Sequence, residues 1–244
     1  MTATVSWVSA VLDSPPETAA ASEVFWAALT GSTLSMRRGA RAEFATLQPD
    51  RGDPHLLVQE VGQSVPGALH LDLHTDDVPG LADRAEELGA SANWHEQGFV
   101  VCGSPGGLTF CVVGHPAARR PPPQQWPGGA SIVDQVCLDI PPSRYDEERA
   151  FWSALTGWRL VDAGDFERLV RPPGVPLAFL LQRLDDEQST VTAHLDLACD
   201  DRDAETARHR ALGAAVVRRT DGWTVMRDPA GRVYCNTGRK PGAV

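Results

Sequence analysis

His70 and His194, which head the same four-residue segment His-Leu-Asp-Leu, are each followed two positions later by an aspartate, Asp72 and Asp196. Alternate side chains of a β-strand point the same way, so on a strand each pair shares one face. Histidine titrates near neutral pH, and a neighbouring carboxylate can orient its ring and raise its pKa, which suits a general acid or base. The alternative interpretation is structural: the aspartates bind backbone groups or cap helices, and the histidines are buried and hydrogen-bonded.

These pairs belong to an internal repeat with an offset of about 124 residues. Four segments return in the same order: FWAALTG at 25–31 as FWSALTG at 151–157, HLDL at 70–73 and 194–197, LGA at 88–90 and 212–214, and Phe110-Cys111 as Tyr234-Cys235. The offset is too long for a solenoid unit, so we expect two homologous domains. Their predicted bounds are 1–115 and 131–240. The Pro-rich residues 116–130 between them are expected to be an extended, semi-rigid linker.

Each half is expected to contain two modules built from a strand, a helix and further strands. In the first half, strands are predicted at 7–13, 43–47, 56–61, 68–74, 99–102 and 108–113. One helix opens at Pro15-Pro16 and stops at Gly31, and another is capped by Asp76-Asp77 and ends at Gly89. In the second half, strands are predicted at 132–140, 166–170, 178–184, 193–199, 223–226 and 232–236, with helices at 143–155 and 203–212.

The repeated Phe-Trp-x-Ala-Leu-Thr-Gly segment, the His-Leu-Asp-Leu segment and the closing Asp228-Pro229…Tyr234-Cys235 motif resemble the glyoxalase-like, or vicinal oxygen chelate (VOC), superfamily. The resemblance covers nearly the whole chain twice and matches the tandem-domain actinobacterial type. It implies an α+β fold of two tandem domains, each made of paired βαβββ modules whose curved sheet surrounds a cleft. The fold hosts many reactions, so it does not by itself give the activity.

In the metal-using members that this chain resembles, four cleft side chains, mostly His, Gln and Glu, hold the ion. The corresponding positions here are Ser9, Gln59, His70 and Thr109 in the first domain and Gln135, Gln182, His194 and Val233 in the second. Both expected carboxylates are missing, and a divalent cation needs anionic donors. We therefore expect no tightly bound metal, with Gln135, Gln182 and His194 as weak candidates. If Asp72 and Asp196 face the cleft, they could supply the missing charge.

Two functions fit this resemblance. The first is an isomerase or lyase that acts on a small organic metabolite, with His194 or His70 as the acid–base group. The predicted ligand contacts are Gln135, Gln182, Gln59, Asp196, Asp72 and Trp223. The second is a non-catalytic protein that sequesters a small molecule, as bleomycin resistance-like members of the superfamily do. The second domain carries more metal-type side chains and is the expected active half.

Composition limits the partners. Lysine and arginine total 22 against 32 acidic residues, a net charge of −10, so nucleic acid and anionic membranes are poor partners.

The five cysteines form no CxxC pair, which favours free core thiols in a reducing compartment. With no signal peptide apparent, the expected location is the cytoplasm. Trp26 and Trp152 are expected in the core, and the chain is expected to be a pseudo-dimeric monomer or a homodimer.

Overall fold

In the computed structural model, residues 3–62, 68–94, 98–114 and 117–242 are described. The helices are α1 (Pro16–Thr30), α2 (Val78–Glu87), α3 (Tyr145–Thr156), α4 (Arg202–Ala211) and the 3-10 helix η1 (Pro142–Arg144). The strands of the first half are β1 (Trp7–Ser14), β2 (Thr33–Leu34), β3 (Phe44–Gln48), β4 (Leu56–Glu60), β5 (Leu69–His74), β6 (Ser91–Trp94), β7 (Val100–Gly103) and β8 (Thr109–Val113). Those of the second half are β9 (Gln124–Trp126), β10 (Gly129–Ile140), β11 (Arg159–Asp162), β12 (Glu167–Val170), β13 (Ala178–Arg183), β14 (Thr192–Cys199), β15 (Ala215–Arg219), β16 (Trp223–Arg227) and β17 (Val233–Thr237). Within these ranges no helix combines the length and the apolar character needed to cross a membrane.

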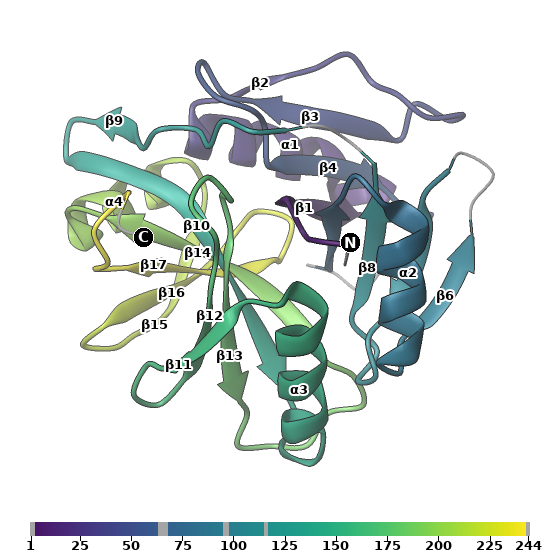
Figure 1. Cartoon of the computed structure of the whole chain (residues 1–244). Coiled ribbons are helices and arrows are strands. Elements are labelled where there is room, and N and C mark those ends of the chain that lie inside the picture. Colours follow the sequence, from purple (N-terminus) through teal and green to yellow (C-terminus); the bar gives the residue numbers. More distant parts are fainter. Residues whose placement is uncertain (1–2, 63–67, 95–97, 115–116, 243–244) are drawn as a thin grey trace. The chain divides into compact units, whose positions relative to one another are not determined.

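Each half of the chain forms one mixed sheet (Figure 1). The strand order of the first sheet is β2-β3-β4-β1-β5-β8-β7-β6. The order of the second is β11-β12-β13-β10-β14-β17-β16-β15, with β9 paired to β10. Strand for strand, the second order repeats the first, so each half carries the strand–helix–three-strand plan twice. The predicted α+β fold with a tandem duplication is confirmed.

The helices begin and end where the local sequence predicts. Helix α1 starts after Pro15 and ends at Gly31, whose φ of 65° is the left-handed conformation that glycine adopts without steric cost. Gly157 ends α3 in the same way, with a φ of 67°. The Asp77 carboxylate accepts a hydrogen bond from the Gly80 backbone N–H at 3.0 Å and caps α2.

Five short strands were not predicted. Four of them, β2, β6, β11 and β15, are the edges of the two sheets. Every residue of β2 and of β15 is exposed, so these strands lack the alternation of apolar and polar residues that marks a half-buried strand. The fifth, β9, lies in the Pro-rich segment and pairs with the start of β10.

The Pro-rich segment is anchored to the loop between β3 and β4. The Asp53 backbone N–H donates to the Arg119 carbonyl at 2.7 Å, and the Asp53 carboxylate accepts from the Arg119 N–H at 2.8 Å. Gly52 lies so close that a Cβ there would be 2.7 Å from Pro121 Cα. Arg119 and Pro121 are thus held against this loop, and the linker role of the segment stays a prediction. The domain bounds 1–115 and 131–240 stay a prediction.

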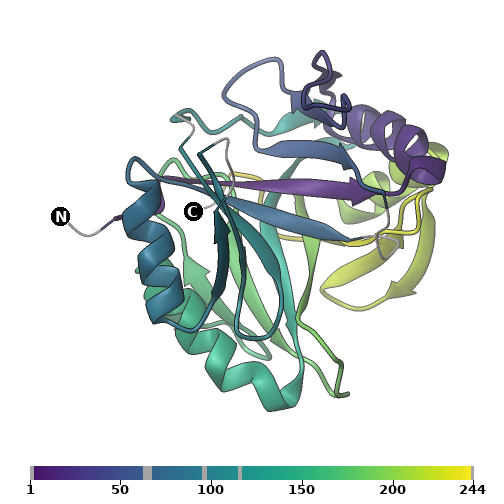
Figure 2. The same cartoon turned by 90° about the vertical axis from the view of Figure 1, so that its right-hand side faces the viewer.

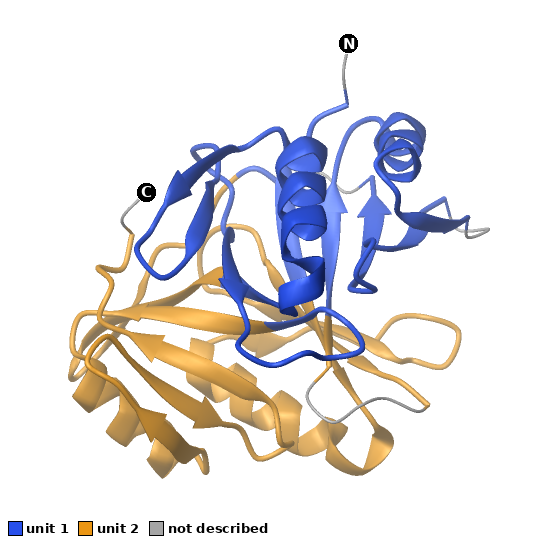
Figure 3. Ribbon diagram, turned by 90° about the horizontal axis from the view of Figure 1, so that it is seen from below, with its two compact units in different colours: residues 1–10, 70–118, 136–193 blue, residues 11–69, 119–135, 194–244 orange. Residues whose placement is uncertain are grey.

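By packing, the chain divides into two compact units that do not follow its halves (Figure 3). Unit 1 comprises residues 1–10, 70–118 and 136–193, and unit 2 comprises residues 11–69, 119–135 and 194–244. In unit 1, α2 and α3 lie against each other (Figures 1 and 2), and the Arg84 guanidinium donates to the Ala154 carbonyl.

Each unit has an aromatic core around one tryptophan. In unit 2, Trp26 packs edge-on against Tyr234 and donates through Nε1 to the Asp228 carboxylate at 2.8 Å. In unit 1, Trp152 packs against Phe110, and its Nε1 donates to a carboxylate in the same way. Both tryptophans are fully buried, which confirms their predicted place in the core.

Candidate functional site

The most organised group of the predicted site residues lies in unit 2, on β14 and β17. These strands run parallel, and Asp196 pairs with Cys235 in their register. Asp196 and His194 are two residues apart on β14, so their side chains share a face. His194 Nε2 lies 3.4 Å from Asp196 Oδ1 and 3.7 Å from Cys235 Sγ. The Asp196 side chain is 5% exposed and the His194 side chain 15%. The carboxylate is thus enclosed, while part of the imidazole remains accessible.

Gln135 joins this cluster from β10. Its Nε2 donates to Asp196 Oδ2 at 2.6 Å. Burial by itself would raise the pKa of Asp196, but hydrogen bonding and the charge of His194, the charge of Arg239 and the Gln135 hydrogen bond hold it below its usual value. Asp196 is therefore an anion at neutral pH, with one oxygen fixed by an amide and the other beside an imidazole.

Positive charge reaches the cluster from the C-terminal residues of unit 2. The Arg239 guanidinium donates to Asp134 Oδ1 at 2.7 Å, and Arg120 lies 3.7 Å from the other oxygen of that carboxylate. Asp134 is buried. Because Asp134 is shared by two guanidinium groups, it does not cancel the charge of Arg239, which also acts on Asp196.

A related but looser group lies in unit 1. His70 Nε2 is 3.8 Å from Asp72 Oδ1 on β5, and Cys111 of β8 pairs with Asp72. Burial raises the pKa of the Cys111 thiol, so it stays protonated at neutral pH. The two aspartates therefore lie beside the histidines, as the acid–base interpretation requires.

The first repeat lacks a counterpart of Gln135. Ser9, at the matching position, instead forms a 2.9 Å hydrogen bond with His74 Nε2.

The remaining predicted residues make other contacts. Gln182, on β13 in unit 1, has its Oε1 3.5 Å from Cys137 Sγ. Gln59 is half-buried on β4 and pairs with Phe44. Trp223 begins β16, where its backbone N–H donates to the Thr220 hydroxyl at 3.0 Å. Val233 is 37% exposed and cannot bind a metal. The structure therefore brings together Gln135, His194 and Asp196 from the second repeat.

Cys235 and Arg239 were not predicted as site residues from the sequence, although Cys235 belongs to the repeated motif. Cys235 could have been predicted, because an aromatic residue followed by cysteine occurs in both repeats. In the structure Cys235 pairs directly with Asp196 on the neighbouring strand. Arg239 lies outside the repeated segments, so no sequence pattern indicated a role for it. Its role depends on the buried Asp134, which only the packed structure shows.

Two clusters have donor atoms that could hold the metal that the superfamily implies. His194, Asp196 and Cys235 each place one ligand atom within 4.8 Å of the others, and so do His70, Asp72 and Cys111. Tetrahedral zinc with bonds of about 2.0–2.3 Å sets its ligand atoms about 3.3–3.8 Å apart. The separations of 3.4 Å and 3.7 Å from His194 Nε2 match this geometry. The donors therefore fit a divalent cation, and the charge of Arg239 opposes its binding.

Unit 2 also has a partly open cavity of about 270 Å³, and none of the predicted site residues lines it. Its wall comes from the end of α1, the loop before β4, the start of β10 and the Pro-rich segment. His55 lies in this wall and donates through Nε2 to the Val133 carbonyl at 3.0 Å. The cavity is thus a feature separate from the His194 cluster.

The duplicated strand–helix–three-strand sheets, with a histidine and an aspartate on the first strand of each second module, define a protein of the glyoxalase-like or VOC class. The family described as glyoxalase-like domain matches residues 9–113 and 135–237. The chain belongs to this family. No curated protein matches it.

Solved structures share the fold at low sequence identity. A Mn(II)-bound glyoxalase from Novosphingobium aromaticivorans aligns over 96% of this chain and 82% of its own length, with a TM-score of 0.64 and 19% identity. An extradiol ring-cleaving dioxygenase from B. fuscum aligns over 98% and 73%, with a TM-score of 0.65 and 13% identity. The chain spans only 50% of a xylose isomerase-like TIM barrel/4-hydroxyphenylpyruvate dioxygenase fusion protein, at a TM-score of 0.64 and 12% identity.

Proposed function

We propose that this protein is a glyoxalase-like enzyme of the isomerase or lyase type, which moves a proton on a small organic molecule at the His194 cluster. The observation that carries the proposal is the buried, anionic Asp196, whose Oδ1 lies 3.4 Å from His194 Nε2 while Gln135 holds its Oδ2. A carboxylate in this place orients an imidazole and stabilises the imidazolium that forms when the ring takes up a proton.

Each residue then has one task. The Asp196 carboxylate lies 3.4 Å from His194 Nε2 and stabilises the imidazolium that forms when the His194 ring takes up a proton. Gln135 fixes the carboxylate from β10, so the His194 ring is oriented by two neighbouring strands. Position 9 of the first repeat holds a serine bonded to His74, and the His70–Asp72 separation is longer, at 3.8 Å. These differences favour the second repeat as the active half.

Metal chemistry is available to the same residues. A divalent cation held by His194, Asp196 and Cys235 would act as a Lewis acid on a substrate oxygen. We propose that the protein works without a tightly bound ion, because Arg239 already places positive charge near Asp196 and the buried thiol would have to lose its proton.

The second candidate is sequestration of a small molecule without turnover. The residue types at the superfamily's metal-ligand positions favour this candidate. Neither repeat has a carboxylate at these positions, and Val233 cannot coordinate a metal. Bleomycin resistance-like members of the superfamily have this kind of function. A saturable ligand without any chemical change would support this candidate over the first.

Proton transfer can be tested without knowing the natural substrate. Acetoin and hydroxyacetone, which carry exchangeable C–H bonds beside a carbonyl, are incubated with the protein in D₂O, and deuterium uptake is followed by NMR. We expect uptake with the unmodified protein and with His70→Gln, and its loss in His194→Gln and Asp196→Asn. Equal rates in all four proteins, or loss in His70→Gln alone, would overturn the assignment. Saturable binding without uptake would favour sequestration.

A further inference from the structure

The cavity of unit 2 has the features of a second ligand site. Its volume of about 270 Å³ is far larger than the roughly 15 Å³ that a single water molecule needs. Its wall is fixed by backbone contacts: Asp53 and Arg119 bond each other twice, and Gly52 packs directly on Pro121. Because two separate stretches of chain are fastened together here, the cavity is a built part of the fold.

The lining indicates a neutral ligand. Six aliphatic side chains contribute to it: Leu29, Leu47, Leu56, Ile132, Val133 and Leu197. The charged lining residues that the structure describes are Asp50 and Arg51, one of each sign and both exposed. A wall of this composition stabilises an apolar body and gives no net attraction to an anion or a cation.

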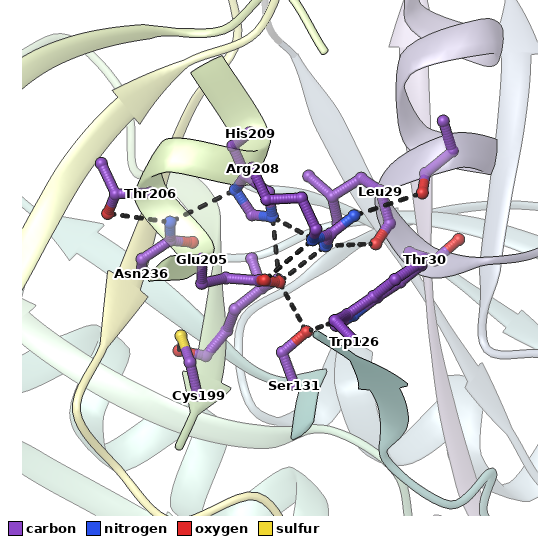
Figure 4. Close-up of polar contacts among 12 residues, drawn as sticks. Leu29, Thr30, Trp126, Ser131, Cys199, Glu205, Thr206, Arg208, His209 and Asn236 are labelled. Carbon is purple, nitrogen blue, oxygen red and sulfur yellow. Dashed lines mark hydrogen bonds and ion pairs between the residues drawn. The ribbon is translucent and has the colours of Figure 1, made fainter. Parts of the chain in front are cut away.

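Ser131 places a hydroxyl in the lining that is already hydrogen-bonded to two other side chains (Figure 4). Its hydroxyl donates to Glu205 at 2.6 Å and accepts from Trp126 Nε1 at 3.0 Å. Glu205 is held in turn by Arg208, whose guanidinium also lies 3.7 Å from the centre of the Trp126 ring. The single proton of Ser131 is therefore committed to a carboxylate, and only a lone pair of its oxygen is left for a ligand.

In two other polar side chains of the lining, the proton is already donated to a backbone carbonyl. The Thr30 hydroxyl donates to the Trp26 carbonyl at 2.7 Å. His55 Nε2 lies 3.0 Å from the Val133 carbonyl, which can only accept, so its proton points there. The hydroxyl oxygens of Ser131 and Thr30 act as acceptors, whereas Gln124 and Gln125, which also line the cavity, carry amides that both donate and accept. A ligand hydroxyl, which also donates and accepts, complements both kinds of group.

We propose that this cavity binds a compact, neutral, mainly aliphatic molecule that carries a hydroxyl group, such as an alicyclic alcohol. The site is independent of the His194 cluster and goes beyond the proposed proton transfer. The ring of the alcohol packs on the leucine, valine and proline side chains, and its hydroxyl donates to an oxygen of the wall.

Borneol and camphor test this proposal, because they share one carbon skeleton and differ in carrying an alcohol or a ketone. Binding is measured by isothermal titration calorimetry on the full chain. We expect borneol to bind saturably and camphor about tenfold more weakly, since a ketone has no proton to donate. Absence of saturable borneol binding, or equal affinity for the two compounds, would overturn the proposal.

Variants place the site. Leu56→Phe fills the cavity from β4, whereas Leu57→Phe changes the next side chain of the same strand, which does not line it. Borneol binding should be lost in the first variant and kept in the second. It should also be unchanged in His194→Gln, so that failure here and failure of the proton-transfer assay are separate results. Unchanged borneol binding in a folded Leu56→Phe protein would contradict the proposed location of the site. If that variant does not fold, the comparison of borneol with camphor tests the proposal instead.

Discussion

Replacing Glu205 with glutamine removes the charge at the centre of the network in Figure 4. The carboxylate accepts from Ser131 at 2.6 Å and from Arg208 at 2.6 and 2.8 Å, and it lies 3.1 Å from His209 Nε2. Burial alone would raise the pKa of Glu205, but the hydrogen bonds from Arg208, His209 and Ser131 lower it from 4.5 to about 2. Glu205 is therefore a stabilising anion of the folded state.

The size of this contribution follows from the pKa difference. One pKa unit corresponds to about 1.4 kcal/mol, so charged Glu205 adds about 3 kcal/mol to the free energy of unfolding at pH 7. Because the folded-state pKa is the lower one, this stabilisation is complete above about pH 5 and is lost as the pH falls towards 2. Glu205→Gln should cost about 3 kcal/mol at pH 7 and about half of that near pH 3.

Urea unfolding followed by tryptophan fluorescence at several pH values measures this difference. Glu87→Gln is the matched control, since Glu87 is exposed at the end of α2, and it should change stability by less than about 0.5 kcal/mol. A Glu205→Gln protein as stable as the original at pH 7, or one whose loss of stability is the same at all pH values, would refute the role given to this carboxylate.

Three further changes test the fold and the cluster. Trp26→Phe removes the Nε1 donor to buried Asp228 and should lower the free energy of unfolding by about 1–3 kcal/mol in urea melts, and no loss would contradict that bond's role. Gly157→Ala places a side chain at a φ of 67° in open space and should cost about 1 kcal/mol from backbone strain alone, measured in the same way, while a neutral result would show that α3 ends differently. Gln135→Leu removes a donor to Asp196 and should raise the pKa of Asp196 in a carboxyl NMR titration, whereas an unchanged titration would mean that the amide does not hold the carboxylate.

The strands and the His–Asp pairs could be predicted because they depend on local periodicity. Because side chains alternate along a strand, His194 and Asp196 must share one face of it, and the same holds for His70 and Asp72 in the first repeat. Glycine at 31 could be interpreted as a helix end because the left-handed conformation excludes most other residues.

What the sequence could not show depends on contacts between distant segments. Gln135 reaches Asp196 across β10 and β14, and its counterpart Ser9 reaches a different partner, so a matching repeat position did not mean a matching contact. The Pro-rich segment was interpreted as a linker because proline restricts the backbone, but composition does not reveal what the prolines pack against. The cavity wall at Pro121 is therefore visible only in the folded chain.

The metal content of the purified protein tests most directly whether the His194, Asp196 and Cys235 cluster works without a tightly held ion. The protein is purified without chelators and analysed for zinc, nickel, iron and manganese by mass spectrometry. Because Arg239 places positive charge beside Asp196, we expect well under one equivalent of any of these metals. One full equivalent that is retained through purification, and lost in His194→Gln, would contradict the proposed metal-independent proton transfer.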